Sequence, residues 1–530
     1  MAPFDQGKFP LPASRADGDP SARAVVVGAG IGGLAAAMRL GAKGWRVTVI
    51  DRLDRPGGRG SSITEAGHRF DLGPTIVTVP HVFEDLWAAC GRDFRSEVDL
   101  RPLDPFYEIR WPCGTRLPVH ASLDAMREEV RRLSPGDVRG WEAFLRDSEK
   151  RYRLGFEDLG RQPMHALAET LRVLPTFARL RADRSVAAHA ASRVRDPRLR
   201  MALSFHPLFI GGDPFRVTSM YILVSHLEAT FGVHYAMGGV AAIAEAMVRV
   251  IEGQGGEVRL GAEADEITVE RGRASGVRLV DGERVPAEIV VSNADAGHTY
   301  DRLLRARPRR RWTPRRLARA RWSMGLFVWY FGTKGTRAMW RDVGHHTILN
   351  GPRYGGLVRD IFRRGRLAED MSLYVHRPSV TDPTCAPPGD DTFYVLSPVP
   401  HLGHRDPVDW SAMRGPYRAR VLAALEAHMP GLSERLGPEV VFTPEEFRDR
   451  YLSPHGCGFS IEPRILQSAW FRPHNVSEEL PGLFLVGAGT HPGAGLPGVI
   501  CSAEVLGRVV PPPAVATVPA APMPLPMAAE

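Results

Sequence analysis

Short apolar runs separated by glycine-rich turns are the first regular pattern along the chain. The residues from Arg23 to Val27 and from Arg46 to Ile50 are largely β-branched and apolar, which is typical of buried parallel strands. Between them, the segment from Leu34 to Leu40 continues as a helix. Further apolar runs, at 290–292 and 483–486, predict strands much later in the chain. We therefore expect a parallel sheet assembled from distant segments.

The turn after the first strand carries a G-x-G-x-x-G pattern at Gly28, Gly30 and Gly33. The first glycine permits a tight turn, the second lets the backbone approach a pyrophosphate, and the third lets the helix pack closely on the strand. The N–H groups and dipole at the helix start face the phosphates. Asp51 ends the second strand about 20 residues later, where a carboxylate accepts the ribose hydroxyls. This arrangement predicts a dinucleotide site.

The residues that follow indicate FAD rather than NAD. Pro56, Gly57, Gly58 and Arg59 come shortly after Asp51, and they bring backbone and a cation to the diphosphate. This pattern resembles the flavoproteins that include amine oxidases, protoporphyrinogen oxidase and carotenoid desaturases. That family more often has Glu at the acid position, and Asp is a shorter substitute. The alternative for the residues from Pro56 to Arg59 is a plain surface turn.

A second glycine-rich segment, GAGTHPGAGLPGV (487–499), follows the last predicted strand and enters a final helix through Ser502 and Ala503. Together with GPTIVT (73–78), LSFHPLFIGGDPF (203–215), HRPSVTDPT (376–384) and HGCGFSIEPRILQSAWFRPHN (455–475), it resembles bacterial-type phytoene desaturases, most of all the purple-bacterial branch. The resemblance covers about residues 23 to 508. The residues expected to contact FAD are Gly28, Gly30, Gly33, Asp51, Arg52, Gly58, Arg59, Gly73, Ala264, Gly489, Thr490, Gly498 and Val499.

The resemblance implies an FAD-dependent oxidoreductase acting on CH–CH groups. It would introduce successive double bonds into 15-cis-phytoene, giving neurosporene or lycopene in carotenoid biosynthesis. Three alternatives stay open. They are a desaturase or isomerase acting on a later carotenoid, an amine oxidase-like flavoenzyme, and a non-enzymatic lipid carrier with a structural FAD.

The expected fold class is α/β, α+β overall, with a Rossmann-like FAD-binding domain built from residues 22–95, 235–300 and 479–510. In related flavoproteins the stretch around Ala264 crosses near the adenine. Residues 96–234 and 301–478 would form an interleaved substrate-binding and helical region that contacts the membrane. Residues 1–21 and the Pro/Ala-rich residues 511–530 are expected to be disordered tails.

Composition limits the number of domains, the class of protein and the cellular compartment. The 530 residues allow two or three domains, and 44% hydrophobic content is ordinary for a globular protein. We expect neither a signal peptide nor a transmembrane helix, because the first 20 residues lack an apolar core segment and no apolar run reaches about 18 residues. The five cysteines are scattered and show no metal-ligand spacing, so we expect reduced thiols in a cytosolic setting and no metal.

Two basic segments are candidate contacts for a membrane. Nine arginines lie between Arg305 and Arg321, with Trp312 and Trp322 nearby, and the net charge of the chain is +8. A solvated helix, anionic lipid and nucleic acid are the alternatives, and we expect no nucleic acid because no binding motif accompanies the run.

The second segment runs from Met164 to Arg195 and predicts an amphipathic helix that lies on lipid or packs on the core. Its stripe consists of Leu167, Leu171, Leu174, Phe177 and Leu180, with Arg172, Arg179, Arg181 and Arg184 between them. The family resemblance favours lipid and implies peripheral attachment at the cytoplasmic side of the cell membrane. The sequence leaves open whether copies associate as a homo-oligomer.

No constellation of catalytic residues stands out, and the catalytic residues stay unassigned. A polyene offers no polar handle, so an apolar cavity is expected while the flavin carries the chemistry. We expect hydride transfer to the flavin, loss of a proton from the neighbouring carbon, and reoxidation by a quinone or oxygen, since a single dinucleotide fingerprint is present. The candidate wall residues are Phe205, Leu208, Phe209, Ile210, Phe215, Met220 and Tyr221, with ordinary core as the alternative.

Several polar residues are further candidates for the active site. Glu462 and Arg464 are candidates to line the active site. His455 and His491 either approach the flavin or serve as hydrogen-bonded structural histidines. His345 and His346 are adjacent in sequence, so on a regular element they would not share a face, which argues against metal binding.

Overall fold

The computed structural model describes residues 22–513, and both predicted tails lie outside the described residues except for 511–513. Its first sheet is parallel, with the order β19-β13-β1-β2-β9. The bounds of these strands are Arg23–Val27 (β1), Arg46–Ile50 (β2), Glu257–Arg259 (β9), Ile289–Ser292 (β13) and Leu483–Leu485 (β19). The parallel sheet therefore takes its strands from three distant stretches, as expected, while the domain boundaries stay a prediction.

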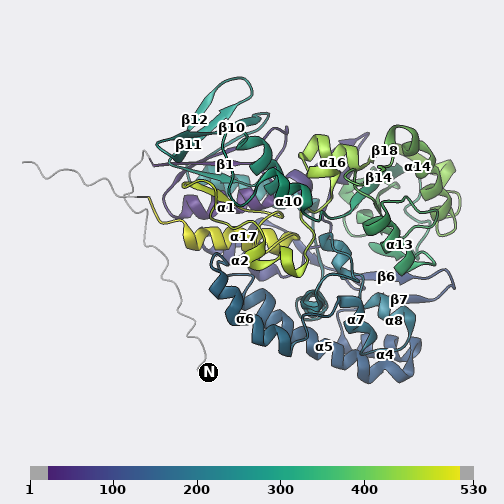
Figure 1. Ribbon diagram of the computed structural model, residues 1–530. Helices are drawn as coiled ribbons and strands as arrows, with labels where there is room; N and C mark the ends of the chain where they lie inside the picture. Colours follow the sequence, from purple (N-terminus) through teal and green to yellow (C-terminus); the bar gives the residue numbers. More distant parts are fainter. Residues whose placement is uncertain (1–21, 514–530) are drawn as a thin grey trace, which may run out of the picture.

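Helices from both ends of the chain cover this sheet. Helix α1 (Ile31–Ala42) packs against α17 (Leu496–Val509) and against α10 (Gly239–Gly253). Figure 1 shows these three helices side by side, although their colours span the whole sequence. Nine of the twelve residues of α1 are buried, so its packing depends on apolar faces on both sides. A smaller antiparallel sheet adjoins this unit, with strands β10 (Ala264–Glu270), β11 (Arg273–Leu279) and β12 (Arg284–Pro286).

A second, seven-stranded sheet has the order β18-β14-β17-β16-β15-β6-β7 and is antiparallel except for the pair β15 and β6. Its strands are Tyr107–Arg110 (β6), Arg116–Val119 (β7), Gly325–Thr333 (β14), His346–Leu349 (β15), Leu373–His376 (β16), Asp391–Val399 (β17) and Leu436–Phe442 (β18).

Central strand β14 shows how this sheet separates two environments. All nine of its residues are buried, because both faces of the strand are covered. Phe327, Trp329 and Phe331 pack in the cluster that contains helix α14 (Trp410–Glu426). Leu326, which points to the other face, lines the large cavity described below.

A helical layer lies along the lower edge of the view in Figure 1. Its members are α4 (Leu123–Leu133), α5 (Val138–Tyr152), α6 (Leu167–Arg179), α7 (Val186–Ala191), α8 (Pro197–Ala202) and α9 (Leu223–Phe231). The remaining short elements are α2 (Pro80–Ala88), α3 (Phe94–Glu97), α11 (Ala296–His298), α12 (Pro314–Arg319), α13 (Tyr354–Arg359), α15 (Leu432–Arg435), α16 (Pro444–Tyr451), β3 (Ser62–Glu65), β4 (His68–Asp71), β5 (Leu100–Pro102) and β8 (His234–Ala236).

The expected single amphipathic helix from Met164 to Arg195 is two helices, α6 and α7. The chain turns at Arg181, whose φ is +53°, a value that interrupts a right-handed helix. Leu167, Leu171 and Leu174 are 43%, 52% and 48% exposed, so these leucines do not pack on the core. None of the described helices combines the length and apolarity required to cross a membrane.

The arginine-rich segment is compact rather than one solvated helix, because only Pro314–Arg319 (α12) is helical within it. Trp312 and Trp322 are buried, so neither is available to stack on a partner. The Arg316 guanidinium lies 4.1 Å from the Trp312 ring centre, and Arg305 pairs with Asp265 at 2.7 Å. Part of the positive charge of this segment is therefore engaged in contacts within the protein.

Candidate active site

The turn between β1 and α1 forms a cradle that an anion can enter. Gly28 adopts φ +100°, a left-handed conformation that favours glycine. A Cβ added at Gly33 would lie 2.0 Å from the Gly28 carbonyl oxygen, so the third glycine sets the approach of helix to strand. Gly30 caps α1 without a side-chain hydrogen bond, and the first turn of α1 carries no acidic residue. The N–H groups of this turn can therefore bind phosphate.

Asp51 stands at the rim of the cradle. Its carboxylate accepts hydrogen bonds from the backbone N–H groups of Ala29, at 2.7 Å, and Leu53, at 2.8 Å. Burial raises the pKa of Asp51, and the two backbone hydrogen bonds oppose that shift. Both oxygens retain lone pairs, so the carboxylate can also accept ribose hydroxyls despite its shorter side chain. Ala264 lines the same end of the cavity.

Arg52 also lines this end, but its guanidinium already has partners. Its Nε lies 3.3 Å from a Glu263 carboxylate oxygen, and Nη1 donates to the carbonyl oxygens of Asp449 and Arg450. These contacts tie the residue after Asp51 to the last turn of α16. Arg52 therefore contributes to this end of the cavity through the aliphatic part of its side chain and through its ion pair with Glu263.

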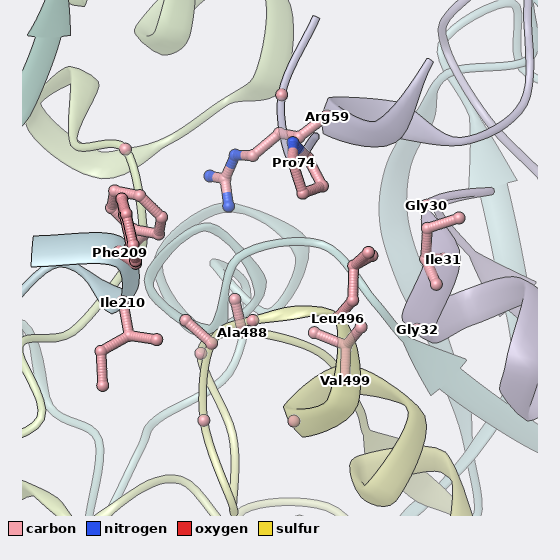
Figure 2. Close-up of a pocket in the computed structure, with 18 of the residues that line it drawn as sticks. Gly30, Ile31, Gly32, Arg59, Pro74, Phe209, Ile210, Ala488, Leu496 and Val499 are labelled. Atoms are coloured by element: carbon pink, nitrogen blue, oxygen red, sulfur yellow. The ribbon is translucent and has the colours of Figure 1, made fainter. Parts of the chain in front are cut away.

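The Gly57–Arg59 turn closes over the cradle. Gly57 adopts φ +102°, its N–H donates to the Ala29 carbonyl at 2.8 Å, and it forms a bridge with Gly30. Figure 2 shows the Arg59 guanidinium reaching into the space near Pro74. Arg59 donates to the Ser453 hydroxyl, while its buried Nε has no partner among the described residues. A cation with an unused donor fits an electron-rich cofactor at this point.

The second glycine-rich segment forms the opposite wall. Gly489, Gly498 and Val499 line the cavity, and Figure 2 shows Leu496 and Val499 at the start of α17 facing Ile31 and Gly32. A Cβ at Gly498 would lie 2.7 Å from the Gly493 carbonyl oxygen, so this helix start also requires glycine. Walls from both ends of the chain enclose one elongated site that fits a dinucleotide.

Two of the predicted cofactor residues lie behind these walls instead of lining them. Gly33 sits beneath the first turn of α1, where it allows close packing. Thr490 is buried, and its hydroxyl donates to the Gly487 carbonyl at 2.9 Å. The other predicted residues, Gly28, Gly30, Asp51, Arg52, Gly58, Arg59, Gly73, Ala264, Gly489, Gly498 and Val499, all line the cavity.

The cavity continues past the cradle into an apolar chamber, and its total volume is about 670 Å³. Six of the seven aromatic and aliphatic residues predicted as wall line it, namely Phe205, Leu208, Phe209, Ile210, Met220 and Tyr221. The prediction for the seventh, Phe215, is wrong, because this residue does not line the cavity. It is 38% exposed and packs on Tyr354, with ring centres 5.6 Å apart, because the chain turns away at Gly211 and Gly212.

Helix α6 contributes to the chamber as well. Thr170, Leu174 and Phe177 line the cavity, although Leu174 is also about half exposed. Leu174 therefore belongs both to the exposed surface of α6 and to the chamber wall.

Three polar candidates from the sequence do not face the cavity. Glu462 accepts from the Asp213 N–H at 3.2 Å and pairs with Arg464 at 2.6 Å, and neither side chain lines the cavity. His455 packs against Trp322 and His401 outside it. The contacts of all three residues indicate structural roles.

His491 does line the cavity, and it is held as a structural histidine. Its Nε2 lies 3.0 Å from the Leu159 carbonyl oxygen and 3.1 Å from that of Gln162, so this nitrogen donates. Burial lowers the pKa of His491 to about 4. The neutral ring thus bridges the second glycine-rich segment to the helical layer.

Sequence reasoning missed Glu228, a carboxylate in the wall of the apolar chamber. It is buried, accepts from the Tyr107 hydroxyl at 2.8 Å, and lies 3.1 Å from His206 Nε2. These hydrogen bonds satisfy a charge that would otherwise be costly to bury. A single acid within the apolar run of α9 was the only available signal.

The expectation that His345 and His346 do not share a face is wrong. His345 lies in the bend before β15 rather than within the strand, so alternation does not apply to this pair. The two ring centres are 4.4 Å apart, and His376 lies within 5.0 Å of both.

Comparison with known proteins places the chain among flavoenzymes. The model of the flavin containing amine oxidoreductase family matches residues 31–504. Solved structures share the fold. An oxidoreductase from Methanosarcina mazei has a TM-score of 0.63 at 17% identity, covering 92% of this chain and 100% of that one. A putrescine oxidase with bound putrescine has a TM-score of 0.59 at 16% identity, covering 92% and 98%.

Sequence relatives are much closer. A neurosporene-forming phytoene desaturase of Cereibacter sphaeroides is 71% identical over 94% of this chain and 96% of its own length. A second, from Rhodobacter capsulatus, is 66% identical over 92% and 94%. A lycopene-forming phytoene desaturase of a Paracoccus species is 43% identical over 92% and 97%. The chain belongs to the flavin containing amine oxidoreductase family, and within it is similar along nearly its whole length to phytoene desaturases.

Proposed function

We propose that this protein is an FAD-dependent phytoene desaturase of carotenoid biosynthesis. The observation that carries the proposal is 71% identity, over 94% of the chain, to a phytoene desaturase. The cavity supports it, because a dinucleotide cradle opens directly into an apolar chamber. A long hydrocarbon could lie in that chamber with one of its CH–CH bonds beside the cradle.

FAD bound in the cradle would supply a two-electron acceptor for the hydride removed from the substrate. The chain itself binds and orients. The N-terminal turn of α1 and Arg59 would hold the diphosphate end and Asp51 the ribose, as argued above. Phe205, Phe209 and Ile210 exclude water from the chamber. The substrate is therefore positioned by shape and by apolar burial.

The product is the finer part of the proposal, and we assign neurosporene. The two relatives with 71% and 66% identity are both neurosporene-forming, whereas the lycopene-forming relative has 43% identity. The number of double bonds introduced depends on how far the polyene can advance through the cavity before release. Residues shared with the first two relatives would set that distance.

We further propose that the enzyme attaches peripherally to the cytoplasmic side of the cell membrane through α6. Three leucines of α6 are about half exposed, and Leu174 also lines the cavity. Phytoene dissolves in lipid, so an entrance at the membrane would deliver it without passage through water. Electrons would leave to a quinone, which shares that membrane, or to oxygen.

The test is expression in a host that makes phytoene, followed by the absorption spectrum of the extracted pigments. We expect neurosporene as the main coloured product. Lycopene as the main product would correct the assigned end point and leave desaturation intact. Colourless phytoene beside soluble, FAD-loaded protein would overturn the proposal, and peroxide formation with amines would then favour the amine oxidase alternative.

A further inference from the structure

A cluster of three buried histidines lies outside the flavin and substrate cavity. His346 begins β15 and His376 ends β16, and the two residues are directly paired across these antiparallel strands. His345 precedes His346 in the chain. One ring nitrogen from each histidine lies within 4.8 Å of those of the other two, and the ring centres are 4.4 to 5.0 Å apart.

The spacing of the rings matches a shared cation. A tetrahedral ion about 2.1 Å from each nitrogen places the centres of its imidazole ligands roughly 5 Å apart. The cross-strand pair fixes the backbone of two of the three histidines, so this spacing follows from the sheet register. Small side-chain rotations would bring the three nitrogens to a common ion.

The three histidines are buried, and four of their ring nitrogens form no hydrogen bond among the described residues. His345, His346 and His376 are 6%, 2% and 0% exposed. Nε2 of His345, Nε2 of His346 and both ring nitrogens of His376 lack a hydrogen-bond partner. A buried polar atom without a partner is destabilising, and here several converge on one point.

Hydrogen bonds on the outer side of the cluster orient the lone pairs of the histidine nitrogens toward its centre. Nδ1 of His346 lies 3.0 Å from the Phe106 carbonyl oxygen, so this nitrogen carries the proton and Nε2 keeps its lone pair. Nδ1 of His345 is bonded to the Thr381 hydroxyl at 2.6 Å, which directs its Nε2 to the cluster. Burial lowers the pKa of all three rings, so they are neutral.

A carboxylate lies beside the histidines. Asp71 ends β4, is buried, and has an oxygen 3.6 Å from His376 Nε2, while its Oδ1 has no partner. The cations next to these residues in the chain have acids of their own. Arg69 pairs with Asp382 at 2.5 Å, and Arg377 pairs with Asp391 at 2.8 Å. Arg69 also interacts electrostatically with Asp71, so Asp71 contributes only part of its negative charge to the cluster.

We propose that His345, His346 and His376, supported by Asp71, form a structural zinc site. Three neutral imidazoles suit Zn²⁺, and Asp71 beside His376 would orient that ring as an outer carboxylate. All four residues are buried, so the ion would be shielded from solvent, which suits a structural role. The ion would pin β15 and β16 of the seven-stranded sheet to β4.

This site would also hold part of the cavity wall. Tyr374 lies two residues before His376 on β16, stacks on His346 with ring centres 5.5 Å apart, and lines the cavity. Its hydroxyl is bonded to that of Thr75, another wall residue, at 2.6 Å. A role in shape rather than in chemistry is expected, because none of the three histidines lines the cavity.

The first experiment measures metal in the holoenzyme. The full chain, carrying an affinity tag without histidines, is produced in zinc-supplemented medium and analysed by inductively coupled plasma mass spectrometry. We expect about one zinc per chain in the wild type, and loss of that zinc in His346→Gln and in His376→Gln. The matched control is His189→Gln, a buried histidine on α7 bonded to Asp147 at 3.0 Å. It should keep the zinc.

A second measurement does not depend on whether the variants fold. The wild-type holoenzyme is stripped with a chelator and titrated with Co²⁺, and tetrahedral coordination should produce visible d–d absorption. Asp71→Asn should weaken zinc binding about 10- to 100-fold, as the loss of a supporting carboxylate does. Wild-type protein that contains no zinc and gives no cobalt bands overturns the proposal. Zinc retained by both histidine variants overturns it equally.

Discussion

Single atoms decide how closely the secondary-structure elements approach one another around the cofactor cradle. At Gly33 a side chain would meet the Gly28 carbonyl oxygen at 2.0 Å, so the third glycine of the motif acts through packing. Thr490 acts in the same indirect way by holding the turn at Gly487. Three buried polar residues of the cavity wall, Asp51, Glu228 and His491, each have hydrogen-bond partners that compensate for their burial.

Gly33→Ala should impair FAD retention. The added Cβ meets backbone rather than a flexible side chain, so α1 must shift, at a cost of about 1–3 kcal/mol typical of overpacking. The measurement is the ratio of flavin to protein absorbance after gel filtration. Gly415→Ala is the control, because a Cβ there meets nothing within 4 Å. Equal flavin content in both variants would contradict the packing argument.

His491 should make the protein sensitive to mild acid. Burial lowers its pKa to about 4, below the ordinary value of 6.5, so the unfolded chain binds more protons between these values. The stabilisation is therefore complete above pH 6.5 and is lost as the pH falls toward about 4, by at most about 1.4 kcal/mol per pH unit for one proton. In denaturant titrations at several pH values, His491→Gln should show a shallower dependence than wild type. An unchanged slope would assign the acid sensitivity to other buried histidines.

The role of each helix, strand or loop around the cavity depends on which of its residues face the cavity. The segment from Phe205 to Ile210 forms the wall, while Phe215, a few residues later, is outside it. Helix α6 places Phe177 and Leu174 at the cavity and Leu167 and Leu171 at the surface. Strand β14 faces a packed aromatic cluster on one side and the cavity on the other.

Phe209→Asp should abolish pigment formation while FAD stays bound. A carboxylate in the chamber must be hydrated or buried without a partner, and either disfavours a hydrocarbon. The readouts are pigment yield in the phytoene-producing host and flavin content of the purified protein. Phe215→Asp, in the same segment but outside the cavity, should retain both. Loss of flavin along with activity in Phe209→Asp would indicate a core role instead.

The double variant Leu167→Ser/Leu171→Ser should weaken binding to lipid vesicles. Fully burying a leucine is worth about 1.5–3 kcal/mol, so removal of two partly inserted side chains should reduce partitioning at least about tenfold. Sedimentation with vesicles of mixed neutral and anionic lipid measures the effect. Val280→Ser, which alters a 65% exposed residue on another surface, should bind like wild type. Equal binding by all three proteins would exclude α6 as the contact.

At the scale of the whole molecule, the two ends of the chain build one unit. Strands β1, β13 and β19 are neighbours in the parallel sheet, and α1 packs on α17. Lys43 donates to the Val510 carbonyl at 2.6 Å, and Trp45 donates to that of Pro511 at 3.1 Å. Because the cradle draws its walls from three distant stretches, cofactor binding stabilises the association of all three.

Removing FAD should lower the thermal stability of the whole chain. A ligand that binds only the folded state adds about 2.7 kcal/mol when its free concentration is a hundred times its dissociation constant. Differential scanning calorimetry of the deflavoprotein and the FAD-reconstituted protein should show one transition that moves to higher temperature with added FAD. A transition indifferent to FAD would mean that the cradle is not coupled to the rest of the fold.

The sequence by itself determined the cofactor class and most of the cradle. Glycine spacing, the acid after the second strand and the second glycine-rich segment are local patterns, and each is tied to the backbone conformation that it requires. The motif blocks also predicted the family that the comparisons confirmed. Six of seven wall residues were identified because they are apolar side chains clustered in or beside the family block at 203–215.

Only the tertiary structure decided which side chains meet across distant segments. Local spacing could not separate Phe215 from Phe209, exclude Glu462 and Arg464 from the cavity, or reveal Glu228 within it. It also could not bring His376 to His345 and His346, since that contact depends on the register of β15 and β16. The physical reason is the same in each case: short-range patterns fix backbone conformation, whereas the neighbours of a side chain depend on how separate elements pack.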